Sequence, residues 1–195
     1  ILSIILPVFS IDIADGVMRY VLDKKYKAPS VLLVAMKMIF CGSIVLFLVL
    51  GIIRFIPSVK IADQYYAFLF MNFVFTSLYN TFINYLKGQE RIKTLVTAGL
   101  MCSLLNAGCN ILFLTKFDMG VNGYLLANIL ATAIPMLYLV LCSWFYGYLG
   151  FGKLSIDKNL EREMLLYSAP LILNGLAWCM NNSLHRVFVT FISGI

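Results

Sequence analysis

Long apolar segments alternate with short polar connections along this chain. Each apolar segment has roughly 20 residues, enough for a helix to cross the ~30 Å hydrocarbon core of a bilayer. Lipid offers the backbone no hydrogen-bond partners, and the strict alternation of a barrel strand is absent, so we interpret the segments as helices. The pattern predicts helices over residues 1–21, 31–53, 65–86, 92–114, 122–148 and 163–195.

The composition agrees with a membrane protein. Hydrophobic residues make up 62% of the chain and charged residues only 12%, whereas about 25% of the residues of soluble domains are charged. The net charge of +6 would suit nucleic acid, but the basic residues lie mostly between the apolar segments, where membrane topology accounts for them. We therefore predict an all-α, polytopic transmembrane helical bundle that contacts the lipid bilayer and no nucleic acid.

The five connections differ in their basic residues. The first, third and fifth carry nine Lys or Arg residues and the others carry three: Lys24, Lys25, Lys27, Lys87, Arg91, Lys93, Lys153, Lys158 and Arg162, against Arg54, Lys60 and Lys116. Because cytoplasmic connections are enriched in Lys and Arg, those near residues 22–30, 87–93 and 149–162 are predicted to be cytoplasmic. Ile1 already lies in an apolar segment, so we expect a longer protein with one more helix upstream.

Three charged residues lie in the first predicted helix. Asp12, Asp15 and Arg19 share one face at 100° per residue. Asp15 and Arg19 are four residues apart, so the two side chains are able to form an ion pair near the headgroups. Alternatively the charges face a water-filled cavity, as charges at membrane depth commonly do.

The last predicted helix carries a polar stripe of Asn174, Trp178, Asn181 and His185, with Asn182 and Arg186 beside it. A guanidinium within the membrane needs a partner or water, whereas the lone histidine suits either packing or proton transfer. Two further helices have polar faces, formed by Asn72, Thr76, Tyr79, Asn80 and Asn84 and by Ser103, Asn106 and Asn110. Such faces form either interhelical hydrogen bonds or the wall of a hydrated interior.

Patterns typical of enzymes and metal sites are missing from the sequence. His185 is the only histidine, and the five cysteines lie in apolar segments without a CxxC pair. No HExxH motif and no glycine-rich phosphate loop is present. We predict no catalytic residues, no metal and no cofactor.

Three stretches resemble the bacterial polysaccharide flippases, which export O-antigen and capsule repeat units. They are ILPVFSIDIADGVMRYVLDKK, NYLKGQERIKTLVTAGL and YSAPLILNGLAWCMNNSLHRVFVTFISGI. In that family they are similar to the second helix, to the connection between the fourth and fifth helices, and to the seventh helix. The family belongs to the multidrug/oligosaccharidyl-lipid/polysaccharide exporter superfamily.

The resemblance implies a MATE-like flippase fold with a dozen or more helices in two bundles, placed in the bacterial inner membrane. This chain would then supply helices two to seven. Residues 1–148 would form most of the N-terminal bundle, 149–162 the cytoplasmic connection between bundles, and 163–195 the first helix of the C-terminal bundle.

The function implied is translocation of an undecaprenyl-diphosphate-linked oligosaccharide by alternating access, with polysaccharide polymerase or assembly proteins as further partners. A diphosphate and sugar hydroxyls suit basic and amide side chains. The predicted cavity residues are therefore Arg19, Arg186, Asn80, Asn174, Asn181 and Asn182, and the charge partners or coupling residues are Asp12, Asp15 and His185.

Two other functions remain open. A cation-coupled multidrug exporter of the same superfamily would use Asp12 or Asp15 as its pivot, and its cavity would be anionic rather than cationic. A membrane-embedded polymerase or acyltransferase would need long outer connections, whereas the second and fourth connections have about ten residues or fewer.

Overall fold

The structure is a computed structural model that describes residues 2–54, 63–147 and 157–193, with side chains described for 5–54, 65–147, 157–178 and 180–181. Every regular element in these ranges is helical: α1 (Leu2–Ser10), α2 (Ile13–Leu22), α3 (Ala28–Arg54), α4 (Asp63–Gly88), α5 (Ile92–Ile111) with a π-helical turn η1 (Leu112–Lys116), α6 (Gly120–Phe145) and α7 (Lys158–Ser193). The predicted all-α helical bundle is confirmed.

Four of these helices are long and apolar enough to cross a membrane. They are Ala28–Arg54, Tyr65–Gly88, Ile92–Lys116 and Gly120–Phe145 among the described residues. Their hydropathy agrees with a multi-pass membrane protein. The predicted boundaries hold to within a few residues for these four, whereas α7 begins five residues before the predicted start at Glu163.

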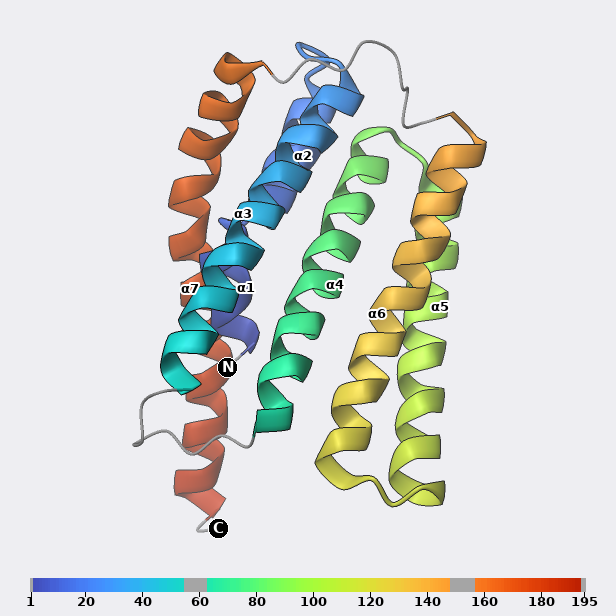
Figure 1. The fold of residues 1–195 in the computed structure, drawn as a ribbon, viewed down its shortest axis with the longest axis vertical. Coiled ribbons are helices and arrows are strands. Elements are labelled where there is room, and N and C mark those ends of the chain that lie inside the picture. Colours follow the sequence, from blue (N-terminus) through green and yellow to red (C-terminus); the bar gives the residue numbers. More distant parts are fainter. Residues whose placement is uncertain (1, 55–62, 148–156, 194–195) are drawn as a thin grey trace.

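The long helices run side by side, with α5 and α6 paired along one edge of the bundle and α7 along the opposite edge (Figure 1). The α2–α3 connection, the α4–α5 connection and the start of α7 lie at the same end, and the α5–α6 connection lies at the other (Figure 1). The basic connections of the described chain therefore gather at one end of the bundle.

Local sequence explains how α4 stops and α5 starts at that end. Glu90 adopts a left-handed conformation with φ 59°, its N–H donates to the carbonyl of Lys87, and the N–H of Arg91 donates to the carbonyl of Leu86. These two bonds form a Schellman motif that satisfies the last carbonyls of α4. The chain reverses there and α5 begins at Ile92.

The main hydrophobic core surrounds α2. Ile13, Val17 and Val21 of this helix are buried and belong to one cluster with apolar side chains of α3, α4, α6 and α7. Gly88 allows the end of α4 to approach α2 closely, because a Cβ atom there would lie 2.7 Å from Cβ of Val21. In contrast, Ala98 is the buried residue of α5, so α2 and not α5 is the centre of packing.

Candidate functional site

The first predicted membrane segment is interrupted in the middle, where a single helix over 1–21 was predicted. Helix α1 ends at Ser10 and α2 begins at Ile13, and the residues between them, Ile11 and Asp12, have φ of 54° and 48°. A left-handed conformation is unusual for a β-branched residue such as isoleucine. The prediction of one continuous helix is therefore wrong.

A side chain beside the interruption helps to explain it. The hydroxyl of Ser10 donates to the carbonyl of Leu6 at 2.6 Å, and a serine bonded back to the carbonyl four residues earlier bends a helix. Pro7 lies inside α1, where its missing N–H further weakens the helical hydrogen bonding.

Neighbouring helices pack closely against the interruption. Gly42 of α3 is in contact with the backbone carbonyl of Phe9, and no Cβ atom fits between them. On α7, a Cβ atom at Gly175 would lie 2.7 Å from Cβ of Pro7 and 3.3 Å from Oδ2 of Asp12. Irregular backbone at membrane depth is tolerated only where protein or a water-filled cavity covers it, and here α3 and α7 cover it.

A cavity of about 170 Å³ opens at the interruption. Its polar lining comes from α1, the Ile11–Asp12 interruption and α4, and consists of Ser10, Asp12, Ser77, Asn80 and Thr81. The hydroxyl of Thr81 donates to the carbonyl of Ser77 at 2.8 Å, but the buried Ser77 hydroxyl has no partner among the described residues. Two predicted site residues, Asp12 and Asn80, therefore share one small polar cavity.

The other two charges of the first segment lie one to two turns further along α2. Asn84 of α4 donates to Oδ1 of Asp15 over a long 3.4 Å. The guanidinium of Arg19 lies over the ring of Tyr167 of α7, 4.3 Å from its centroid. A second cavity of about 650 Å³ is lined here by Asp15, Met18, Arg19, Leu22, Asp23 and Tyr167.

Of the two alternatives for Asp15 and Arg19, the ion pair is not formed. In the part of the chain with described side chains, ion pairs join Lys25 to Glu163 at 2.9 Å and Lys37 to Glu161 at 2.8 Å. Both pairs attach the start of α7 to the first connection and to α3.

The other polar faces have different roles. On α4, Thr76 donates to Asn72 at 3.1 Å. On α5, Asn106 donates to Asn128 of α6 at 3.1 Å, and Asn110 donates to Asn106 at 2.7 Å. The α5 face thus joins α5 to α6 by interhelical hydrogen bonds, which is the simpler of its two interpretations.

Asn174 and Asn181, the predicted site residues of α7 whose side chains are described, do not line the two cavities described above. Asn174 and Asn181 are exposed, and Trp178 is 63% exposed. The side chains of Asn182, His185 and Arg186 lie outside the described residues. Sequence reasoning did not predict Tyr167 as a site residue. Its one signal in the sequence is its position, next to Ser168 and Pro170 in the helix that carries the predicted polar stripe.

Where side chains are described, no three His, Cys, Asp or Glu residues gather closely enough to hold a metal ion. No family model, no curated protein and no solved structure matches this chain. Its function is therefore inferred from the residues and geometry of the site.

Proposed function

We propose that this chain is part of a flippase that moves an undecaprenyl-diphosphate-linked oligosaccharide across the bacterial inner membrane. The observation that carries the proposal is the interrupted membrane segment formed by α1 and α2, whose three charged residues line two cavities. Discontinuous membrane helices form the substrate and ion sites of many transporters. The substrate class comes from the sequence resemblance.

The larger cavity is lined by one guanidinium and two carboxylates, so it is not the cationic cavity expected of a flippase, and the proposal depends on the donors of Arg19. Arg19 presents a planar set of donors, and guanidinium groups bind phosphate oxygens in pairs of hydrogen bonds. Asp15 and Asp23 line the same cavity, and carboxylates accept hydrogen bonds from sugar hydroxyls. Tyr167 supports the guanidinium through a cation–π contact. Arg19 would therefore hold the diphosphate while the carboxylates contact sugar.

Transport would follow from alternating access between two helical bundles. Helices α2, α3 and α4 supply most of the packed core, to which α7 adds Leu160 and Met164, and α7 meets α2 across the cavity that contains Arg19. In this scheme α7 begins the second bundle. Movement of α7 relative to α2 would open or close the cavity toward the end of the bundle where the basic connections gather.

One observation favours the cation-coupled exporter as a second candidate. Asp12 shares its cavity with the Ser77 hydroxyl, which has no partner among the described side chains, and carboxylate and hydroxyl oxygens suit a small cation. The C-terminal end of α1 adds carbonyl groups at the negative end of a helix. A drug exporter would depend on this cavity more than on Arg19.

The test compares substitutions in the two cavities. The full-length protein that contains this chain is produced in a strain lacking its polysaccharide flippase, and surface polysaccharide is measured at matched membrane protein level. Arg19→Gln should reduce surface polysaccharide about tenfold or more, because a charge-assisted hydrogen bond contributes about 1.5–3 kcal/mol. Arg19→Lys should restore only part of it, since lysine lacks the planar fork.

Arg162→Gln is the matched control, because Arg162 is exposed on α7 and lines neither cavity. Normal polysaccharide from Arg19→Gln would contradict the flippase proposal. Loss of drug resistance in Asp12→Asn, with Arg19→Gln unaffected, would identify the drug exporter instead. The sequence also assigns Arg186 to the substrate, so Arg186→Lys is measured in the same assay.

A further inference from the structure

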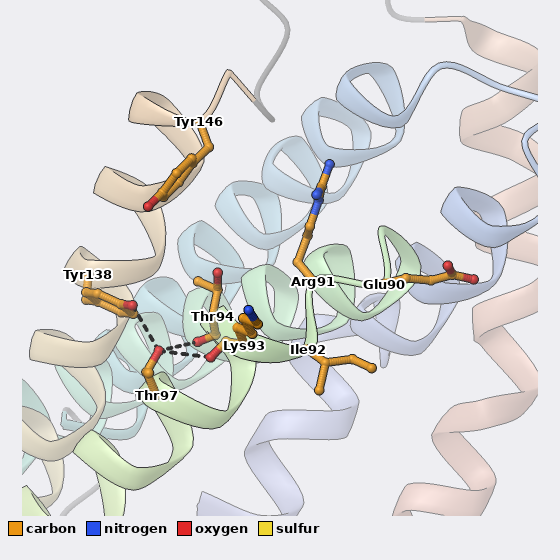
Figure 2. Close-up of a pocket in the computed structure, with 8 residues that line it drawn as sticks. All are labelled: Glu90, Arg91, Ile92, Lys93, Thr94, Thr97, Tyr138 and Tyr146. Carbon is orange, nitrogen blue, oxygen red and sulfur yellow. Dashed lines mark hydrogen bonds between the residues drawn. The ribbon is translucent and has the colours of Figure 1, made fainter.

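A third pocket lies away from α2 and α7, between the start of α5 and the end of α6. Its volume is about 560 Å³, and Figure 2 shows the residues around it. The start of α5 supplies its N-cap, Arg91, and two residues of its first turns, Lys93 and Thr97. The end of α6 supplies Tyr138 and the C-cap residue Tyr146. The flippase proposal makes no use of this pocket.

The pocket has a cationic and hydroxyl-rich lining. Arg91 and Lys93 are both exposed, and the Thr97 hydroxyl lies 2.9 Å from the hydroxyl of Tyr138. The one carboxylate of the lining, Glu90, extends away from the two tyrosines (Figure 2). The lining carries two cations and one carboxylate, so an anion in the pocket would meet more positive than negative charge.

An exposed apolar stripe starts at the pocket and continues down α5. Ile92, Val96, Leu100 and Leu104 are 68%, 55%, 59% and 72% exposed, and their spacing of four residues places them along one side of the helix. In a membrane-spanning helix such a side faces hydrocarbon. Because Ile92 also lines the pocket, the stripe and the pocket are continuous.

The position of the pocket along the helix matches the headgroup layer. The helical segment Ile92–Lys116 has 25 residues and is about 37 Å long, which exceeds the hydrocarbon thickness of roughly 30 Å. Its first turn therefore reaches the level of lipid phosphates when Leu100 and Leu104 contact acyl chains. A ligand with a phosphate joined to acyl chains fits both features at once.

We propose that this pocket binds the headgroup of an anionic glycerophospholipid, with its phosphate at Arg91 and Lys93 and an acyl chain along the α5 stripe. Basic pockets between membrane helices at the cytoplasmic surface are suited to anionic lipid headgroups. The hydroxyl of Thr97 donates to the backbone carbonyls of Lys93 and Thr94, so the Tyr138 hydroxyl is the one that turns to the phosphate or the glycerol. The lipid would anchor α5 to α6 at the end where the basic connections gather, and this role is independent of the proposed transport.

The experiment is native mass spectrometry of the full-length protein, released from micelles that contain equal amounts of phosphatidylglycerol and phosphatidylcholine. Wild-type protein should retain phosphatidylglycerol in preference to phosphatidylcholine. The double variant Arg91→Gln/Lys93→Gln should weaken phosphatidylglycerol binding about 25-fold, since each basic residue near the membrane surface contributes roughly fivefold. Lys93→Gln alone, which leaves the end of α4 intact, should weaken it about fivefold.

The matched control is Lys158→Gln/Arg162→Gln, which removes the same two kinds of charge from exposed positions at the start of α7. It should leave phosphatidylglycerol binding within about twofold of wild type. Equal losses in both double variants, or equal retention of the two lipids by wild type, would overturn the proposal. Displacement of phosphatidylglycerol by equimolar undecaprenyl diphosphate would also overturn it, because the pocket would then belong to the substrate. A variant that loses polysaccharide export but still binds phosphatidylglycerol would leave the lipid-binding proposal standing, because export tests only the flippase proposal.

Discussion

At the scale of single residues, the charged groups of α2 take partners from other helices rather than from their own. Arg19 lies over Tyr167, and Asp15 accepts a hydrogen bond from Asn84. A cation over an aromatic face contributes about 0.5–1 kcal/mol at an exposed site. An ion pair between residues four apart contributes about 0.2–0.5 kcal/mol in an isolated helix. To form it, the Arg19 side chain would have to leave its position over the Tyr167 ring.

Double-mutant cycles separate the two arrangements. Arg19→Gln combined with Tyr167→Leu should show a coupling of about 0.5–1 kcal/mol in the free energy of unfolding, measured by thermal unfolding of the purified protein. Arg19→Gln combined with Asp15→Asn should give a smaller coupling, of about 0.3 kcal/mol or less. A larger coupling for Arg19 with Asp15 than with Tyr167 would mean that the ion pair exists after all.

At the scale of elements, the interruption between α1 and α2 depends on glycines in the helices that pack against it. Gly42 lets α3 contact the carbonyl of Phe9 at the end of α1, and Gly175 lets α7 contact Pro7 and Asp12. Such contacts require the absence of a Cβ atom rather than the conformational freedom of glycine.

A pair of glycines in α3 tests this contact. Gly42→Ala should lower the free energy of unfolding by about 1–3 kcal/mol, because the new methyl group overlaps the Phe9 carbonyl. No atom lies within 4 Å of the position that a methyl group at Gly51 would take, so Gly51→Ala in the same helix should be neutral or raise that free energy by about 0.5–1 kcal/mol. Equal effects of the two substitutions, measured by thermal unfolding, would show that α1 does not lie against α3 at Gly42.

At the scale of the whole molecule, the helices place the basic connections at one end of the bundle (Figure 1). Two ion pairs, Lys25 with Glu163 and Lys37 with Glu161, join α7 to the rest of the bundle near that end. The positive-inside rule predicts that this end is cytoplasmic. The two cavities lined by α2, and the pocket between α5 and α6, would then lie between mid-membrane and the inner surface.

Cysteine accessibility in intact cells tests the orientation. In a background without native cysteines, single cysteines at Lys25, Gln89 and Lys158 should be protected from a membrane-impermeant reagent, whereas one at Asp118 in the α5–α6 connection should be labelled. Permeabilised cells provide the control, since all four positions should then react. The reverse pattern in intact cells would overturn the predicted orientation and the assignment of helices to the flippase family.

The sequence by itself determined four of the six predicted membrane spans and the polar face of α2, and it predicted the end of the bundle where the basic connections gather. These are local properties: hydropathy summed over about 20 residues locates a span, and helical periodicity places Asp15 and Arg19 on one side of α2. Asp12 lies in the interruption before α2, so the predicted common face of all three charges is wrong. Both the hydropathy of a segment and its helical periodicity depend only on residues that are close in the sequence. For the same reason the boundaries of α3, α4 and α5 could be predicted closely.

Only the tertiary structure decided how the interruption of the first segment is covered and which partners its charges take. Asn84 meets Asp15 across 69 positions of the chain, Tyr167 meets Arg19 from another helix, and the α5 asparagines bond to Asn128 rather than to a cavity. The energy of each arrangement depends on how closely helices approach, which glycines such as Gly42 permit. That approach is a property of packed helix pairs, and no local sequence pattern contains it.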